Sequence, residues 1–122
     1  MNGVKFFVNF TPLYEHQTEL DLYKKWLNQV APGASPTFFG LFAWSAAKLF
    51  VQKSVQLGGK LTRASLVSAV LHTNDWTGGG MHAPMVVGAK HPPVCVRWMT
   101  VTNGKFTSFT PKYICGGYTK AS

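Results

Sequence analysis

Two cysteines are the residues whose spacing points most clearly to chemistry, because Cys95 and Cys115 flank a predicted β-hairpin. Asn103 and Gly104 favour a two-residue type I′ turn between its strands. With that turn, the strands bring Cys115 within reach of Cys95 after a small bend. We expect a disulfide, which would indicate an oxidising compartment; the alternative is two buried free thiols in a cytosolic protein.

The other groups with catalytic potential lack the patterns that catalysis requires. The glycine-rich residues 77–80 lack the Lys-Ser/Thr of a phosphate-binding loop, and Ser45 and Ser65 lack a glycine-flanked nucleophile elbow. Only one carboxylate, Asp75, lies near the histidines, and no metal-ligand spacing exists among His16, His72, His82 and His91. The sequence therefore predicts no enzyme, no metal site and no cofactor.

The net charge of +8 raises the question of nucleic-acid binding. The basic residues are scattered singly, apart from the pair Lys24 and Lys25, and the chain has only two arginines, Arg63 and Arg97. Because no basic stripe is visible, we expect no nucleic-acid partner. The charge instead fits general solubility or a missing acidic portion of a longer chain.

The composition indicates one compact domain, residues 1–122, with an incomplete surface. Apolar residues make up 46% of the chain and charged residues 13%, so part of the folded surface must be covered by something other than charge. Lys48 interrupts the longest candidate, 38–55, so no apolar run reaches the eighteen or so residues of a membrane span. Residues 1–5 lack the features of a signal peptide, and any export signal is expected upstream.

Strand signals lie near both ends of the chain. Residues 4–10 form a short β-rich run that ends before Pro12. The hairpin is predicted over about 94–109, with Thr102 opposite Lys105 and Val94 opposite Tyr113.

Three helices are predicted between these strands, over about 18–30, 36–57 and 62–72. The first has a capping-box pattern that begins at Thr18, and the third has Thr62 as its N-cap. The second is predicted to begin with Ser35 as N-cap and Pro36 at the first helical position.

The helix over 36–57 is apolar nearly all round, which is typical of a helix buried on several sides. Two short helices and one hairpin cannot hide all of its apolar residues, so we expect a homodimer or higher oligomer in which these helices bury one another. The residues expected to take part are Phe38, Leu41, Phe42, Trp44, Leu49 and Phe50.

The order of these features resembles the last third of type I periplasmic binding proteins, the branched-chain amino acid (Leu/Ile/Val) receptor type of ABC transporters. The resemblance covers nearly the whole chain. It is carried by WSAAKLF at 44–50, GGKLTR at 58–63, WTGGG at 76–80, NGKF at 103–106 and the two cysteines around the last motif.

The resemblance implies an α/β fold, namely a partial type I lobe with three helices, a crossing strand and a C-terminal β-hairpin. It implies an extracytoplasmic solute-binding component, periplasmic or at the cell surface, that delivers amino acids or related amides to an ABC transporter permease. This chain would be the C-terminal part of such a receptor. The alternative is a small self-associating interaction module without a transport role.

The family places an aromatic near the start of the long helix, at the edge of the ligand cleft. Phe39 is the best match and Phe38 the next, by their distance before Trp44, which takes the place of the family's aromatic before Ala-Ala. Tyr14 follows the crossing strand and could also reach the cleft. An aromatic in an apolar helix is more often part of a core, and the family's main carboxylate and ammonium contacts lie in lobes absent here.

Overall fold

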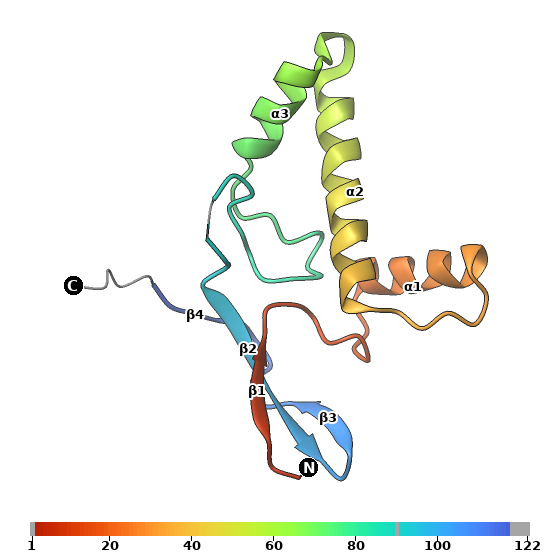
Figure 1. Ribbon diagram of the computed structural model, residues 1–122, viewed down its shortest axis with the longest axis vertical. Coiled ribbons are helices and arrows are strands. Elements are labelled where there is room, and N and C mark those ends of the chain that lie inside the picture. Colours follow the sequence, from red (N-terminus) through yellow and green to blue (C-terminus); the bar gives the residue numbers. More distant parts are fainter. Residues whose placement is uncertain (1, 90, 118–122) are drawn as a thin grey trace.

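The computed structural model describes residues 2–89 and 91–117. A four-stranded antiparallel sheet forms one end of the molecule, α2 and α3 form an arm at the other end, and α1 lies across the base of α2 (Figure 1). The described residues therefore form a mixed helix and sheet structure with three helices. The elements are β1 (Lys5–Val8), α1 (Thr18–Val30), α2 (Phe38–Leu57), a 3₁₀ turn (Gly58–Lys60), α3 (Arg63–Leu71), β2 (Cys95–Thr102), β3 (Lys105–Ser108) and β4 (Ile114–Cys115).

The sheet is built around β2, which pairs with each of the other three strands. Its turn into β3 has Asn103 at φ 50° and Gly104 at φ 74°, the left-handed conformations that a type I′ turn requires. Thr102 faces Lys105, as the sequence predicts. The local turn chemistry therefore sets the register of this hairpin.

The hairpin does not continue in that register to the cysteines. Cys95 faces Cys115 and Val96 faces Ile114. The prediction that Val94 faces Tyr113 is therefore wrong, because the partner of each of these β2 residues lies three positions further along the chain than the predicted register places it. The N–H groups of Phe109 and Thr110 both donate to the Trp98 carbonyl, at 2.8 and 3.2 Å. The chain therefore bulges after β3, and the bulge absorbs the extra residues.

Two helices have N-caps other than those predicted, although α1 spans Thr18–Val30 as predicted. The N-cap of α1 is Gln17, whose side-chain oxygen accepts the Leu20 N–H at 2.9 Å, and not a capping box at Thr18. The N-cap of α2 is Thr37, whose hydroxyl accepts the Gly40 N–H at 3.0 Å. Because the threonine hydroxyl lies two residues beyond the predicted Ser35 cap, α2 starts at Phe38.

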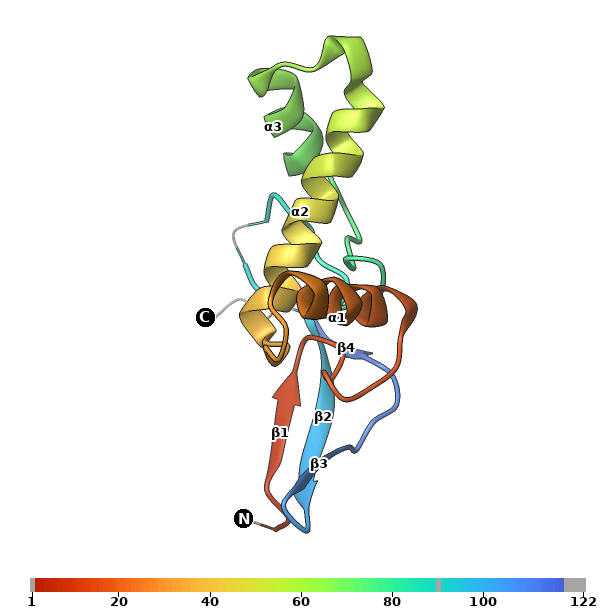
Figure 2. The same ribbon diagram turned by 90° about the vertical axis from the view of Figure 1, so that its right-hand side faces the viewer.

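The N-cap of α3 is the predicted Thr62, which exchanges hydrogen bonds with Ser65 in a capping box. Such caps satisfy N–H groups of the first turn that have no partner within the helix. The cap fixes the start of α3, which packs back along the upper half of α2 (Figure 2).

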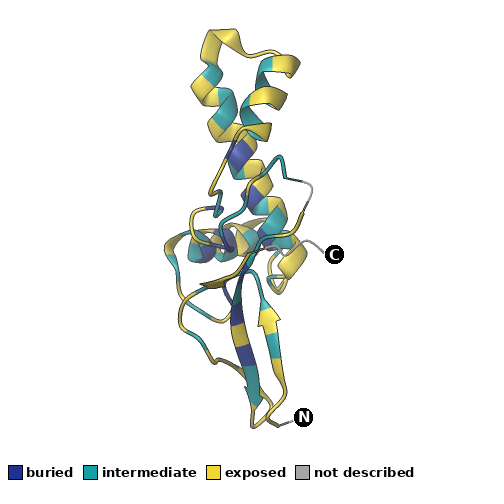
Figure 3. Ribbon diagram, turned by 90° about the vertical axis from the view of Figure 1, so that its left-hand side faces the viewer, coloured by how far each residue is buried: buried dark blue, intermediate teal, exposed yellow. Residues whose placement is uncertain are grey.

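The core lies where α1 crosses α2 and comprises Leu20, Tyr23, Leu41 and Met81. A side chain at Gly40 would place its Cβ 2.2 Å from the Tyr23 hydroxyl, so glycine allows the two helices to approach this closely. Along α2 only Leu41, Ser45 and Leu49 are buried, and much of the rest of the helix is exposed (Figure 3).

This exposure corrects the expectation that α2 is buried on several sides. Within one chain, Phe39 is 80% exposed and Phe50 56% exposed. Leu41 and Leu49 are instead buried inside the chain, so they are not available to a second copy. α1 and the loop before β2 cover one side of the lower part of α2, and α3 packs along its upper half, while Phe39 and Phe50 remain exposed.

Candidate functional site

Two chain segments cross side by side between the helical part and the sheet. The Thr11 N–H donates to the Met81 carbonyl at 2.8 Å, and the Ala83 N–H donates to the Asn9 carbonyl at 2.7 Å. Phe10 and His82 form an antiparallel bridge between these bonds. The crossing is therefore a short, backbone-bonded junction between the two parts.

A buried polar group lies behind this junction. The Ser45 hydroxyl lies 2.7 Å from His82 Nε2 and accepts the Trp76 Nε1–H at 2.9 Å. His82 Nδ1 lies 2.9 Å from the Ala83 carbonyl, which only accepts, so Nδ1 carries the proton and Nε2 accepts from Ser45.

The Ser45 and His82 pair has the distance of a nucleophile and its base, but its environment favours a structural role. The two residues are 2% and 1% exposed, so a substrate cannot reach them. The imidazole is oriented by a backbone carbonyl and not by a carboxylate. The pair therefore joins α2 to the crossing segment as a satisfied buried hydrogen bond.

Burial lowers the pKa of His82 below its ordinary value of 6.5, although the Ala83 carbonyl acts in the opposite direction. The unfolded chain then takes up a proton more readily than the folded one, so stability is lost as pH falls below 6.5. We expect the melting temperature to fall between pH 7 and about pH 5, above the range where carboxylates titrate. His82→Gln should weaken the pH dependence of the melting temperature. The control His72→Gln, at an exposed histidine, should leave that dependence unchanged. Equal pH dependence in the two variants would contradict the prediction.

Aromatic rings gather on the open side of the junction. Phe38 contacts Phe10 and Phe42 with ring centroids 5.1 and 5.0 Å apart, and it touches Phe39 at 5.1 Å. The Phe42 ring stacks on His82 at 5.1 Å. The structure therefore places Phe38 at the crossing, while Phe39 points largely into solvent.

A hollow of about 370 Å³ lies on the sheet face next to these rings. Tyr14 lies in its wall, and the Tyr14 hydroxyl is 3.2 Å from the Ser108 hydroxyl. Phe10 lines the hollow together with Tyr14 and also contacts Phe38, so this ring adjoins both the hollow and the aromatic group. The hollow is lined by Phe6, Val8, Phe10, Pro12, Leu13, Tyr14, Met99 and Phe106.

Trp44 lies on the side of α2 that contacts α1. Its indole N–H donates to Glu19 at 2.8 Å, its ring is 5.9 Å from that of Tyr23, and Lys48 also bonds Glu19. Burial alone would raise the pKa of Glu19, but the hydrogen bonds from Lys48 and Trp44 hold it below 4.5. Trp44 therefore helps to fix the angle between the helices and is not brought together with Phe38 and Tyr14.

An ion pair between the buried Arg97 and the half-buried Glu15 adjoins the hollow. Both terminal nitrogens of Arg97 donate to the Glu15 carboxylate, at 2.7 and 3.0 Å, and Ser108 donates to the same carboxylate at 2.8 Å. Arg97 also lies over the Tyr113 ring, 5.9 Å from its centroid. The pair ties the segment after β1 to β2 and β3.

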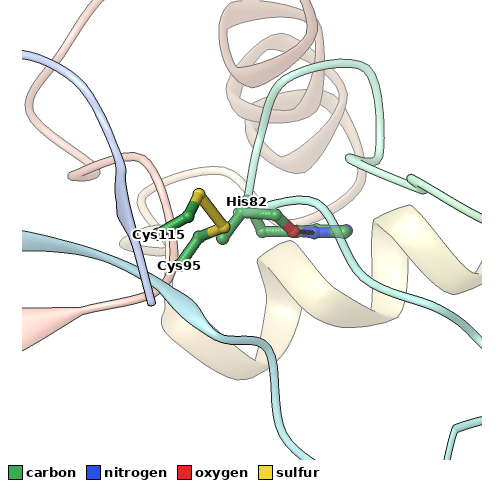
Figure 4. The surroundings of a disulfide bond; sticks show 4 residues. His82, Cys95 and Cys115 are labelled. Atoms are coloured by element: carbon green, nitrogen blue, oxygen red, sulfur yellow. Dashed lines mark hydrogen bonds between the residues drawn. A yellow bond between two sulfur atoms is a disulfide. The ribbon is translucent and has the colours of Figure 1, made fainter. Parts of the chain in front are cut away.

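The predicted disulfide is confirmed. Cys95 and Cys115 are bonded, with sulfurs 2.09 Å apart, and no cysteine of the chain is free. Figure 4 shows the bridge between the two neighbouring strands, with His82 in its surroundings. The bond therefore fastens the two-residue strand β4 to the start of β2.

No protein-family model, curated protein or solved structure matches this chain. Across residues 2–89 and 91–117, no cluster of three or more His, Cys, Asp or Glu side chains is placed to hold a metal ion. Within the same residues, no helix has both the length and the apolar character that crossing a membrane demands.

Proposed function

We propose that this chain is the C-terminal part of an extracytoplasmic solute-binding protein that delivers amino acids or related amides to an ABC transporter permease. The observation that carries the proposal is the paired crossing at Phe10 and His82, which joins a helical part to a sheet part. Receptors of the family that the sequence resembles bind their ligand between two lobes joined by crossing segments, and closure about such a hinge buries the ligand.

The candidate ligand residues support this proposal by their positions. Phe38 comes from the first turn of α2 and Tyr14 from the segment after β1, and both flank the crossing. Phe39 extends the same aromatic edge at the start of α2. Such rings cover the apolar side of a small ligand, while polar groups elsewhere fix its charged ends.

The disulfide supports the extracytoplasmic part of the proposal. Structural disulfides persist in oxidising compartments and are rare in the cytosol. Cys95 is buried and its partner lies directly across the ladder, so the bridge is part of the folded sheet.

The isolated chain is expected not to bind leucine at micromolar concentration. The hollow beside Tyr14 is almost wholly apolar and offers no partner for an ammonium or carboxylate group. One lobe surface also supplies only one wall of a site that needs two. Calorimetry with leucine and related amides is the measurement. Binding with a micromolar dissociation constant that is lost in Phe38→Ala and Tyr14→Ala would contradict this expectation.

The proposal itself is tested on the natural protein, isolated from the cells that express it. Antibodies raised against this chain would be used to isolate that product from fractionated cells, followed by intact-mass measurement and calorimetry with amino acids. We expect a longer oxidised protein outside the cytoplasm that binds an amino acid or amide. A reduced cytoplasmic product of 13.4 kDa without such binding would refute the proposal.

A small self-associating interaction module is the second candidate. It is favoured by the exposure of large apolar side chains on α2, among them Phe39, Phe50 and Val55. Such a module would act without a transporter.

A further inference from the structure

One face of α2 carries an uncharged stripe of four residues, Phe39, Ala43, Ala46 and Phe50, called here the α2 stripe. All four are exposed. At about 100° per residue they fall within about 60° of the helix circumference. They lie away from the buried side of the helix, which carries Leu41, Ser45 and Leu49. α3 packs along the upper half of α2 and leaves Phe50 56% exposed.

The spacing of the four residues of the α2 stripe is symmetric about the middle of the stripe. Phe39 and Phe50 are equally far from a midpoint between Trp44 and Ser45, and so are Ala43 and Ala46. An antiparallel copy of α2, related by a two-fold axis through this midpoint, would set Phe39 against Phe50 and Ala43 against Ala46. The alanines would let the helix axes approach, and the phenylalanines would close each end. Self-complementarity of this kind is the property of an interface between identical subunits.

The exposed area of the chain is large enough to provide such an interface. A compact protein of 13.4 kDa is expected to expose about 6500 Å², whereas this chain exposes 8402 Å². The excess of about 1900 Å² is spread over the whole chain, and each partner in a standard stable interface buries roughly 800 Å². The two large aromatic residues of the stripe are of the type that anchors such interfaces.

The charges near the α2 stripe allow two copies to meet. Lys48 lies on the other side of α2 and bonds Glu19 of its own chain. Lys53 lies beyond the end of the stripe and would face Pro36 of the second copy. No lysine is therefore set directly against another along the stripe, although the net charge of +8 on each copy opposes association at low salt.

We propose that this chain forms a two-fold symmetric homodimer through antiparallel pairing of the α2 stripes, with Phe39 of each copy packed against Phe50 of the other. This inference goes beyond the proposed function and does not rest on it. It replaces the broader set of interface residues expected from sequence, since Leu41 and Leu49 are used inside the chain and Phe42 and Trp44 are half-buried there.

Sedimentation velocity at micromolar concentration tests the interface. Wild type should sediment at about twice 13.4 kDa, and more completely as salt is raised. Phe39→Asp and Phe50→Asp should each raise the dissociation constant by about 30-fold or more, as loss of a central aromatic anchor does. Val55→Asp is the matched control, because Val55 is 74% exposed on the same helix but lies about 160° from Phe39, and it should leave dimerisation unchanged.

Circular dichroism checks that each variant is folded. If the aspartate variants do not fold, Ala46→Arg replaces them, because this exposed position tolerates a long helix-forming side chain in the monomer. It should block the close approach of the two helices and yield a folded monomer.

Cysteine cross-linking tests the antiparallel register. In the proposed dimer the two copies of position 39 lie about 16 Å apart along the helices, too far for a disulfide. Phe39→Cys chains should therefore cross-link with Phe50→Cys chains and not with one another. A monomeric wild type across the micromolar range, equal dissociation by Val55→Asp, or preferential cross-linking of Phe39→Cys to itself would each overturn the proposal.

Discussion

Arg97→Met is expected to lower the free energy of unfolding by about 3 kcal/mol, the lower end of the range for breaking a buried ion pair from one side, because the Glu15 side chain stays 27% exposed. The Arg97 side chain is 7% exposed, and its guanidinium makes a two-nitrogen contact with Glu15. Without it, the carboxylate keeps the Ser108 hydroxyl as partner but loses its charge-assisted bonds. Urea unfolding at one fixed protein concentration measures the change.

Two further variants distinguish the loss of the ion pair from the effect that removing any positive charge has on stability. Lys24→Met removes another cation, but the Lys24 ammonium bonds a backbone carbonyl and lies 3.7 Å from Asp21 in a partly exposed pair. Its loss should cost less than about 1 kcal/mol. The double variant Glu15→Gln/Arg97→Met should be less destabilised than Arg97→Met alone, because no carboxylate is left unpaired. If Arg97→Met costs no more than Lys24→Met, the pair does not hold the sheet to the preceding segment.

The same pair has a consequence at acid pH. Burial alone would raise the pKa of Glu15, but the bonds from Arg97 and Ser108 hold it below 4.5. The folded pKa lies below the unfolded one, so this stabilisation is present above about pH 4.5 and is lost as pH falls through the folded pKa. Arg97→Met should reduce this acid dependence.

The parts of the fold that sequence predicts correctly depend on neighbours in the chain. The turn at Asn103 and Gly104 needs two residues that accept positive φ, and the cap at Thr62 needs a hydroxyl three residues before an N–H group. The start of α2 shows the limit of such signals, because Ser35, Pro36 and Thr37 offer competing starts and the Thr37 hydroxyl prevails.

The site depends on contacts that no local pattern reveals. Ser45 and His82 lie 37 residues apart, and Glu15 and Arg97 lie 82 apart. A carboxylate near the start and an arginine in a late strand give no sign of pairing until the crossing brings β1 beside β2. The one signal in the sequence is Arg97, a lone arginine within the predicted strand. An arginine on the buried face of a strand requires a partner for its charge.

The exposure of α2 was also beyond local patterns. An apolar sequence all round a helix predicts that each side has a partner, but it does not say whether the partner lies in the same chain. The crossing of α1, the return of residues 73–85 and the packing of α3 cover part of the helix, and the residues of the α2 stripe remain exposed.

Removal of the disulfide is expected to cost about 3 kcal/mol, because the bridge closes a loop with a sequence separation of 20 and so restricts the unfolded chain. The folded side also contributes, since β4 has only two residues in the ladder. Its release would free Tyr113, whose ring lies beside Arg97 and whose hydroxyl lies 3.5 Å from that of Thr11.

The measurement compares urea unfolding of wild type with that of Cys95→Ala/Cys115→Ala, each with and without reductant. Reductant should weaken wild type to about the level of the double variant and should leave the double variant unchanged. Mass spectrometry after alkylation without reductant should find no modified thiol in native wild type, and two after reduction. Two reactive thiols in the native protein would contradict the bridge and would remove the main support for an extracytoplasmic location. If the disulfide forms but contributes no stability, backbone pairing alone holds β4 to β2. Tyr113 would then keep its place beside Arg97 in the double variant.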